Sequence, residues 1–108
     1  YDETIQLLSE SRPAACRALG EDHFHCLSLA HILGVAHLHR GADLGDFLAA
    51  GAIFRDVILR NRKVLGPDHP RTRTSEETFV SALEALEKAG CEAGILKKLS
   101  SGILRDEP

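Results

Sequence analysis

The sequence contains no methionine and no tryptophan, and aromatic residues make up only 5% of its 108 positions. No hydrophobic run approaches the roughly 20 residues that a membrane-spanning helix needs. The sequence has no basic segment that is followed by an apolar run and a small-residue cleavage site. We therefore expect no targeting segment within these 108 residues. Because the chain opens at Tyr1, we expect a fragment of a longer protein rather than a processed product.

The sequence also lacks an excess of positive charge. Lys and Arg total 13 against 16 for Asp and Glu, which gives a formal net charge of -3. A generic nucleic-acid-binding surface needs a basic footprint, so we predict no nucleic-acid partner and no membrane span. Hydrophobic residues at 44% and charged residues at 27% are typical of one soluble globular domain.

Cysteine is scarce, with only Cys16, Cys26 and Cys91. Three cysteines cannot all pair within the chain, and their scattered spacing is not that of a disulfide framework. We therefore expect them to pack as small apolar residues and favour a reducing compartment, the cytoplasm. An organelle reached after removal of a targeting segment is the alternative.

The apolar residues recur with the period of one helical face in four stretches, and no stretch alternates long enough to predict a strand. We expect an all-α chain of five helices, the first of which bends or breaks near Arg12 because Pro13 lacks an amide hydrogen. The four faces consist of Ala30, Leu33, Gly34 and His37; Phe47, Ala50, Phe54 and Val57; Phe79, Ala82, Leu83 and Leu86; and Ile95, Leu99 and Ile103.

Two linkers are near-copies of each other, Leu-Gly-Glu-Asp-His at 19–23 and Leu-Gly-Pro-Asp-His-Pro at 65–70, and they begin 46 positions apart. Each copy joins a glycine suited to positive φ after a helix to an aspartate able to accept from free amides of the next helix. Thr74 and Glu77 would form a capping box if the helix begins that late. A repeat of this period predicts a helical solenoid.

The linker at 65–70 and the residues around it resemble tetratricopeptide repeats of the kinesin light chain type. Gly34 and Gly41 fall at that family's small residue and turn glycine, and Phe47, Ala50 and Phe54 at its second-helix positions. Small residues such as Gly34 and Ala50 let paired helices approach, and the two rings fill the remaining space. His37 in place of a tyrosine and a four-residue excess at 42–45 depart from the pattern.

The resemblance implies an antiparallel helix-pair superhelical solenoid of about two and a half repeats within a single domain, 1–108. Residues 1–18 would be the second helix of a preceding repeat, 19–64 the first full repeat, and 65–108 a second, partly degenerate repeat. Such a solenoid binds a peptide or a partner helix on its concave face. The positions expected there are Ser28, His31, Val35, Leu38, His39, Thr74, Glu77, Ser81 and Glu84.

The charges expected on the concave face suit a basic or mixed partner. Members that bind acidic peptides often carry an asparagine pair there, whereas this chain has His31-Ile32 and Glu77-Thr78. A separate concentration of positive charge has two interpretations: a solvated helix face, or a patch for an acidic partner or phosphate groups near the second linker. Its members are Arg55, Arg60, Arg62, Lys63, Arg71 and Arg73.

Six histidines invite a metal hypothesis, but the spacing argues against one. His37 points to a different side of its helix from His31 and from His39, and His23 and His69 are explained as residues that order the repeated linker. A cysteine nucleophile with a histidine base, with Cys26 and His31 or Cys91 as candidates, would lack an orienting group. No phosphate-binding loop, G-x-S-x-G, H-E-x-x-H or C-x-x-C occurs. We therefore predict no metal, no cofactor and no catalysis.

These observations predict a non-catalytic protein-protein interaction module or scaffold. The alternative is a structural subunit of a large multiprotein assembly, docked through its convex face and ends. A third interpretation is a scaffold segment of a longer enzyme or signalling protein.

Overall fold

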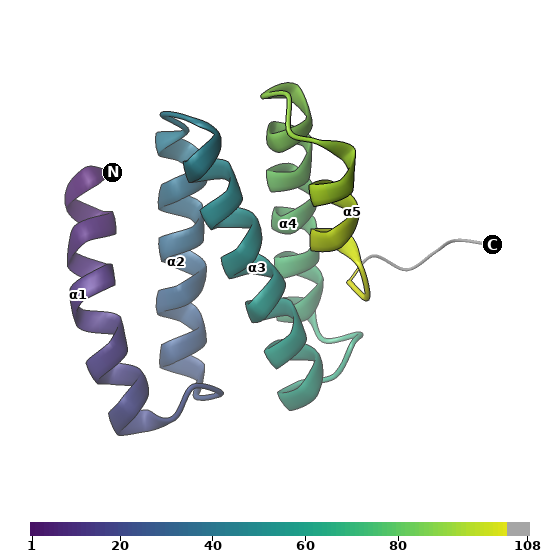
Figure 1. Ribbon diagram of the computed structural model, residues 1–108. Coiled ribbons are helices and arrows are strands. Elements are labelled where there is room, and N and C mark those ends of the chain that lie inside the picture. Colours follow the sequence, from purple (N-terminus) through teal and green to yellow (C-terminus); the bar gives the residue numbers. More distant parts are fainter. Residues whose placement is uncertain (104–108) are drawn as a thin grey trace.

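The computed structural model describes residues 1–103, and there it consists of five helices (Figure 1). Consecutive helices run antiparallel, side by side, so the all-α prediction and the helix count are confirmed for this part of the chain. The last five positions of the expected second repeat, 104–108, lie outside the described residues. The helices are α1 (Asp2–Leu19), α2 (Phe24–Arg40), α3 (Leu44–Val64), α4 (Pro70–Lys88) and α5 (Ala93–Ser100).

Helix α1 is continuous through Pro13, so it does not break near Arg12, and this half of the expected bend or break is wrong. A proline inside a helix leaves the carbonyl oxygen four residues earlier, here that of Ser9, without its usual amide partner. Pro13 and Ser9 are both exposed, so water can satisfy that carbonyl. The helix is held on its other side, where Ile5 and Leu8 pack against α2.

The two linkers adopt the same local conformation. Gly20 and Gly66 have φ of 97° and 95°, which confirms the expected left-handed glycines. The residue that caps the next helix is the histidine and not the aspartate: His23 caps α2 and His69 caps α4, both with extended backbone. This corrects the aspartate prediction, and the capping box at Thr74 is also wrong because α4 begins at Pro70.

The core surrounds α3, which packs against α2 on one side and α4 on the other. Phe54 of α3 and Phe79 of α4 are fully buried, and Ile58, Ala50, Ala82 and Ile103 complete this cluster. The predicted apolar faces of these central helices are therefore confirmed. In the last segment Ile95 is 38% exposed, whereas Ile103, which follows α5 instead of belonging to it, is buried.

The crossing of α2 and α3 depends on Gly34. A Cβ atom placed at this position would lie 2.7 Å from Cε1 and 2.9 Å from Cζ of the Phe54 ring. Such distances are shorter than side chains in close-packed interiors tolerate. The prediction that Gly34 permits a close helix pair is therefore confirmed.

A buried ion network fixes the turn between α2 and α3, and sequence reasoning missed it. Asp46 is 3% exposed and accepts from the Arg40 guanidinium, from the Ala42 amide at 2.9 Å and, at 3.0 Å, contacts Nδ1 of His37. The Arg40 hydrogen bonds, followed by those of His37 and Ala42, hold the pKa of Asp46 well below its usual range despite its burial. Part of the four-residue excess, Leu44 and Gly45, forms the first turn of α3.

The cysteine prediction is partly wrong, because Cys16 and Cys26 form a disulfide and only Cys91 is free. The linker turns the chain back, so the end of α1 and the start of α2 bring the two Cα atoms to 5.4 Å, an ordinary spacing for a disulfide. Sequence spacing cannot show this proximity. Disulfides persist mainly in oxidising compartments, so this bond argues slightly against a reducing cytoplasm.

We expect the Cys16→Ala/Cys26→Ala double variant to lose roughly 2–3 kcal/mol of unfolding free energy, because the disulfide closes a short loop in the unfolded chain. Thermal unfolding followed by circular dichroism measures the loss. Cys91→Ala is the control and should change stability little. If the unfolded, unreduced wild type shows three reactive thiols instead of one, the disulfide does not form in solution.

None of the helices within residues 1–103 is both long and apolar enough to cross a membrane.

Candidate interaction groove

An open groove of about 440 Å³ lies between the first halves of α2 and α4, with the second half of α3 as its floor. We call it the α2–α4 groove. Helix α3 lies between the two walls, and α2 and α4 contact each other little. The groove is lined by Asp22, Phe24, Leu27, Ser28, His31, Ile32, Val57, Asn61, Val64, Leu65, Pro70, Arg71, Thr74 and Ser75.

The rim of the α2–α4 groove carries exposed apolar side chains. Phe24, Ile32 and Val64 are 47%, 48% and 50% exposed, although other large apolar residues of the same helices are buried. Several exposed apolar side chains around one concavity are typical of a binding surface, whereas single ones are common on any protein. The groove can therefore bury apolar groups of a ligand.

The two walls are joined at one end by Arg71 and Phe24. The Arg71 guanidinium carbon lies 3.7 Å from the centroid of the Phe24 ring, within the range of a cation–π contact. Both residues belong to first helical turns, Phe24 to α2 and Arg71 to α4. This end of the groove therefore depends on where those two helices begin.

The floor of the groove contains a polar pair whose hydrogen bonds are satisfied. Nδ2 of Asn61 donates to Oγ of Ser75 at 3.1 Å, and that hydroxyl donates to the Arg71 carbonyl oxygen at 3.1 Å. Both side chains belong to buried residues. Because a buried polar group is costly only when it lacks a partner, this pair stabilises the α3–α4 contact.

His31 supplies a titratable group to the groove. Its ring is half-buried and lies 5.5 Å from the Phe54 ring, centroid to centroid. Burial lowers the pKa of His31, so the imidazole is neutral at pH 7 and presents a polar, uncharged group.

The structure brings three of the expected concave residues, Ser28, His31 and Thr74, into the groove lining. Val35 and Leu38 are partly buried against the Phe54 cluster instead. His39 is exposed but lies beside Tyr1 of α1, with ring centroids 5.8 Å apart. The remaining expected residues, Glu77, Ser81 and Glu84, are exposed on α4 beyond the groove lining.

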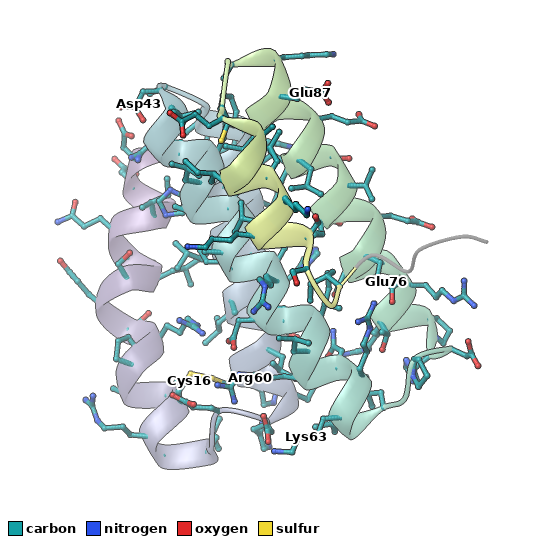
Figure 2. All side chains as sticks on the ribbon, turned by 45° about the vertical axis from the view of Figure 1, so that its right-hand side comes forward. Cys16, Asp43, Arg60, Lys63, Glu76 and Glu87 are labelled. Carbon is teal, nitrogen blue, oxygen red and sulfur yellow. A yellow bond between two sulfur atoms is a disulfide. The ribbon has the colours of Figure 1, made fainter. Side chains whose placement is uncertain are left out.

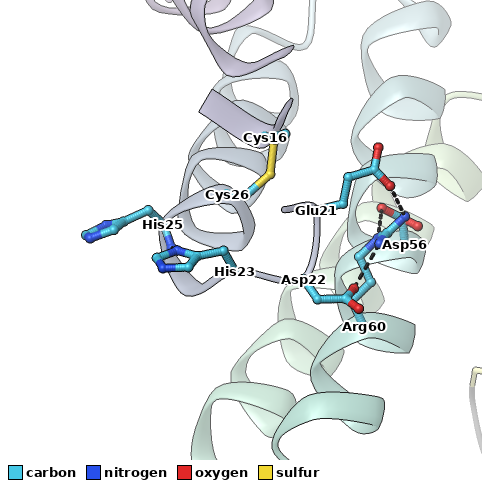
Figure 3. Close-up of a disulfide and its surroundings, with 8 residues drawn as sticks. All are labelled: Cys16, Glu21, Asp22, His23, His25, Cys26, Asp56 and Arg60. Carbon is cyan, nitrogen blue, oxygen red and sulfur yellow. Dashed lines mark hydrogen bonds and ion pairs between the residues drawn. A yellow bond between two sulfur atoms is a disulfide. The ribbon is translucent and has the colours of Figure 1, made fainter. Parts of the chain in front are cut away.

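The expected acidic-partner patch is divided among separate intramolecular contacts. Arg60 pairs with Glu21, Asp22 and Asp56, each at 2.9 Å, and Figure 3 shows it between these carboxylates. Lys63 also pairs with Asp22, at 3.0 Å. The hydrogen bonds of Lys63 and Arg60 lower the pKa of Asp22, and those of Asp56 and Asp22 raise the pKa of Arg60.

The other cations of the patch face elsewhere. Arg62 pairs with Glu76 at 3.2 Å and donates to the carbonyl oxygens of Gly102 and Ile103, so it holds the segment after α5. Arg73 pairs with Asp68, and Arg55 donates to the Leu99 carbonyl oxygen. In Figure 2, Arg60 and Lys63 lie toward the lower end of the molecule, below Glu76.

Within residues 1–103, no three His, Cys, Asp or Glu side chains come together in a way that could hold a metal ion. His23 and His25 stack at 5.3 Å between ring centroids and point away from the disulfide (Figure 3). Of the two candidate nucleophiles, Cys26 has no free thiol because it is bonded to Cys16, whereas Cys91 is free.

Residues 1–103 form a small all-helical domain of sequential antiparallel helix pairs, and an apolar groove lies between α2 and α4. Comparison of the chain with protein-family models, curated proteins and solved structures finds no match.

Sequence reasoning missed the apolar rim of the groove. Phe24 occupies the position that Pro70 holds in the second linker copy, and this large aromatic residue directly after the linker was the available signal. Val64 and Leu65 end α3, where the apolar period gives no indication of exposure. Their role depends on α4 starting beside them, which is a tertiary contact.

Proposed function

We propose that the chain is a tetratricopeptide-like, non-catalytic protein-protein interaction module that binds a peptide or a partner helix in the α2–α4 groove. The observation that carries the proposal is the concavity of about 440 Å³ with exposed apolar side chains on its rim. Helix-in-groove recognition uses such apolar surfaces, lined by a few polar groups that fix the orientation of the ligand.

Two further observations support a repeat architecture as the basis of this function. The two linkers share glycine φ values and a histidine cap, and the helix pairs follow one another in the same antiparallel sense. Stacked pairs of this kind present the first helix of each pair, here α2 and α4, on one face. The groove lies between these two helices.

The α4 surface favours a partner with basic groups beside its apolar residues. Glu77, Ser81 and Glu84 follow Thr74 at spacings that keep them on one side of α4, and all are exposed. A ligand that continues from the groove along α4 therefore meets two carboxylates. Basic side chains complement this surface, whereas acidic ones are repelled.

The alternative function is a structural subunit that docks through its convex face and ends. The exposed Leu59 of α3, outside the groove lining, is the feature that favours it. The two functions place the important surface on different helices, so they predict opposite results for one pair of variants.

We expect Ile32→Glu to abolish partner binding, because it places a charge in the apolar groove, and the matched Leu59→Glu to leave binding intact. Ile32 and Leu59 are 48% and 39% exposed, so both substitutions leave the core untouched. The measurement is affinity purification from the cells that produce the protein, with quantitative mass spectrometry. Unchanged helical circular dichroism excludes unfolding.

The reverse pattern, with partners lost by Leu59→Glu and kept by Ile32→Glu, assigns the chain to the structural-subunit alternative. Equal recovery of partners by both variants contradicts the groove as a binding surface.

A further inference from the structure

Arg71 is a groove-lining cation with no carboxylate within ion-pair distance among residues 1–103. Its guanidinium carbon lies 3.7 Å from the centroid of the Phe24 ring. The other cations of the expected acidic-partner patch bond to carboxylates or to a carbonyl oxygen of the chain. A guanidinium stacked on a ring keeps its N–H donors in its own plane, where a carboxylate can accept two of them. The stacked Arg71 side chain is therefore able to bind an acidic group of a ligand.

The carboxylates of the two linkers do not neutralise this charge. Asp22 belongs to the groove lining, but it is paired with Arg60 at 2.9 Å and with Lys63 at 3.0 Å. Asp68 of the second linker is paired with Arg73 at 3.1 Å. The first turns of α2 and α4 contain no acidic residue, so the positive ends of both helix dipoles add to the same charge. The end of the groove where α2 and α4 begin is therefore electropositive.

The surface of α4 has the opposite charge further along the helix. Glu77 and Glu84 are exposed, and neither forms an ion pair in the part of the chain that the structure describes, 1–103. They follow Arg71 by six and thirteen positions, which places them about 9 and 20 Å further along the helix axis. A segment that leaves the groove along α4 therefore passes from a positive to a negative region.

The α2 wall supplies apolar contacts and no negative charge. Helix α2 contains no acidic residue. Burial lowers the pKa of His31, so this wall is also without a positive charge from that ring at pH 7. Its residues in the groove lining are Phe24, Leu27, Ser28, His31 and Ile32. An apolar wall opposite a charged one fits an amphipathic segment, which has an apolar face and a charged face.

We propose that the α2–α4 groove selects an amphipathic partner segment with opposite charges at its two ends, an acidic side chain bound by Arg71 and basic side chains beside Glu77 and Glu84. The inference rests on the proposed function, because it names the partner of the same groove. A segment with one sign of charge at both ends meets repulsion at one of them. Polyanions do not fit, because they need several cations along one track and here one cation is followed by carboxylates.

The test is a displayed library of amphipathic helical peptides that share one apolar stripe and carry Glu or Lys independently at each end. Selection on the full chain, followed by sequencing, measures how strongly each combination of ends is enriched. We expect peptides with Glu at one end and Lys at the other to be enriched about tenfold over those with two like ends, because a charge-assisted pair replaces a repulsive contact.

Two charge-reversal variants should change this selection in opposite ways. Arg71→Glu makes both regions negative, so we expect peptides with Lys at both ends to become the most enriched. Glu77→Lys/Glu84→Lys makes both regions positive, so we expect Glu at both ends. All three positions are exposed, and an acidic residue in the first turn of α4 suits the helix dipole, so these variants should fold. Helical circular dichroism checks the fold.

Arg73→Glu is the matched control. Arg73 is an exposed cation on the same helix, but it lies outside the groove lining and pairs with Asp68. This variant should keep the wild-type selection. If it changes the selection as Arg71→Glu does, the net charge of the chain explains the preference and the proposal is overturned.

The Ile32→Glu variant separates failure of this inference from failure of the proposed function. If no peptide is enriched on the wild type relative to Ile32→Glu, the groove does not bind such segments, and the proposed function and the inference both fail. If peptides are enriched on the wild type whatever the charges at their ends, the groove function stands and the inference alone is overturned.

A second measurement isolates the contact of Arg71. The most enriched peptide, and the same peptide with its acidic end changed to glutamine, are titrated against the wild type and against Arg71→Gln. We expect either change alone to weaken binding about tenfold, and both together to weaken it little more, because the same contact is lost. A combined loss of about a hundredfold would show that the two groups act independently and would overturn the proposal.

Discussion

Gly34→Ala should lower the unfolding free energy by about 2 kcal/mol, although alanine is the better helix former. The new Cβ would lie 2.7 Å from Cε1 of Phe54, and that ring is fully buried and cannot move without disturbing the core. Cγ2 of Ile53, at 3.2 Å, closes the remaining space. Overpacking of this kind outweighs the propensity gain of about 1 kcal/mol. Urea unfolding followed by circular dichroism measures the change.

Gly51→Ala is the matched control, because Gly51 is also a buried glycine inside a helix. Its Cβ would meet Cδ1 of Leu99 at 3.4 Å and Cδ1 of Leu86 at 3.6 Å, which are ordinary contacts. We expect a gain of up to about 1 kcal/mol from helix propensity. The two identical substitutions should therefore have opposite signs. A stabilising Gly34→Ala would contradict the α2–α3 crossing described above.

Asp46→Ala should cost roughly 3 kcal/mol, because it leaves the Arg40 guanidinium, the His37 ring and the Ala42 amide without their shared acceptor. Asp46 also occupies the first turn of α3, where its charge favours the helix dipole. The loss is measured as a fall in the thermal unfolding midpoint at pH 7. A change below about 0.5 kcal/mol would be typical of an exposed ion pair and would contradict the buried network.

The same carboxylate determines how the protein responds to acid. The pKa of Asp46 is held below its usual range in the folded chain, so the unfolded state binds the proton first as the pH falls. Its contribution to stability is complete above about pH 4, the usual range of the carboxyl group, and is lost progressively below it. The Asp46→Ala variant should therefore show a flatter acid dependence below about pH 4 than the wild type.

Asp56→Ala is the control for Asp46→Ala. Asp56 lies on the same helix and pairs with Arg60 four residues later, but its side chain is 49% exposed. We expect a loss below about 0.5 kcal/mol at pH 7, because water screens exposed pairs. Equal losses for the two aspartates would show that burial of Asp46 does not set the size of its contribution.

Local sequence features were sufficient for the type and number of the elements, but not for all of their ends. Apolar residues three and four apart predict helices whatever their neighbours, and Gly20, Gly41 and Gly66 mark turns because φ is positive at each. The close pairing at Gly34 was predicted from the resemblance to tetratricopeptide repeats, which places a small residue there, and the structure confirms it. The resemblance to tetratricopeptide repeats and the binding function it implies stay predictions.

Features that join distant residues could not be predicted. The Cys16–Cys26 bond depends on the direction in which the linker turns, and the Asp46 network depends on Arg40 folding back over the start of α3. Pro13 was expected to bend or break α1, and α1 does not break there, because the exposure of Pro13 and the packing of the opposite face outweigh one lost hydrogen bond. The shared histidine caps also required coordinates, because sequence cannot show which side chain reaches the free amide.

The sequence by itself determined that the chain is helical, where its helices turn and which faces are apolar, because these properties depend on residues within one or two turns of each other. Only the tertiary structure decided that α2 and α4 stand apart over α3 and leave an apolar groove. It also decided that most of the basic patch is paired internally. Both outcomes depend on how whole helices cross and on contacts between residues far apart in the sequence, which no local pattern records.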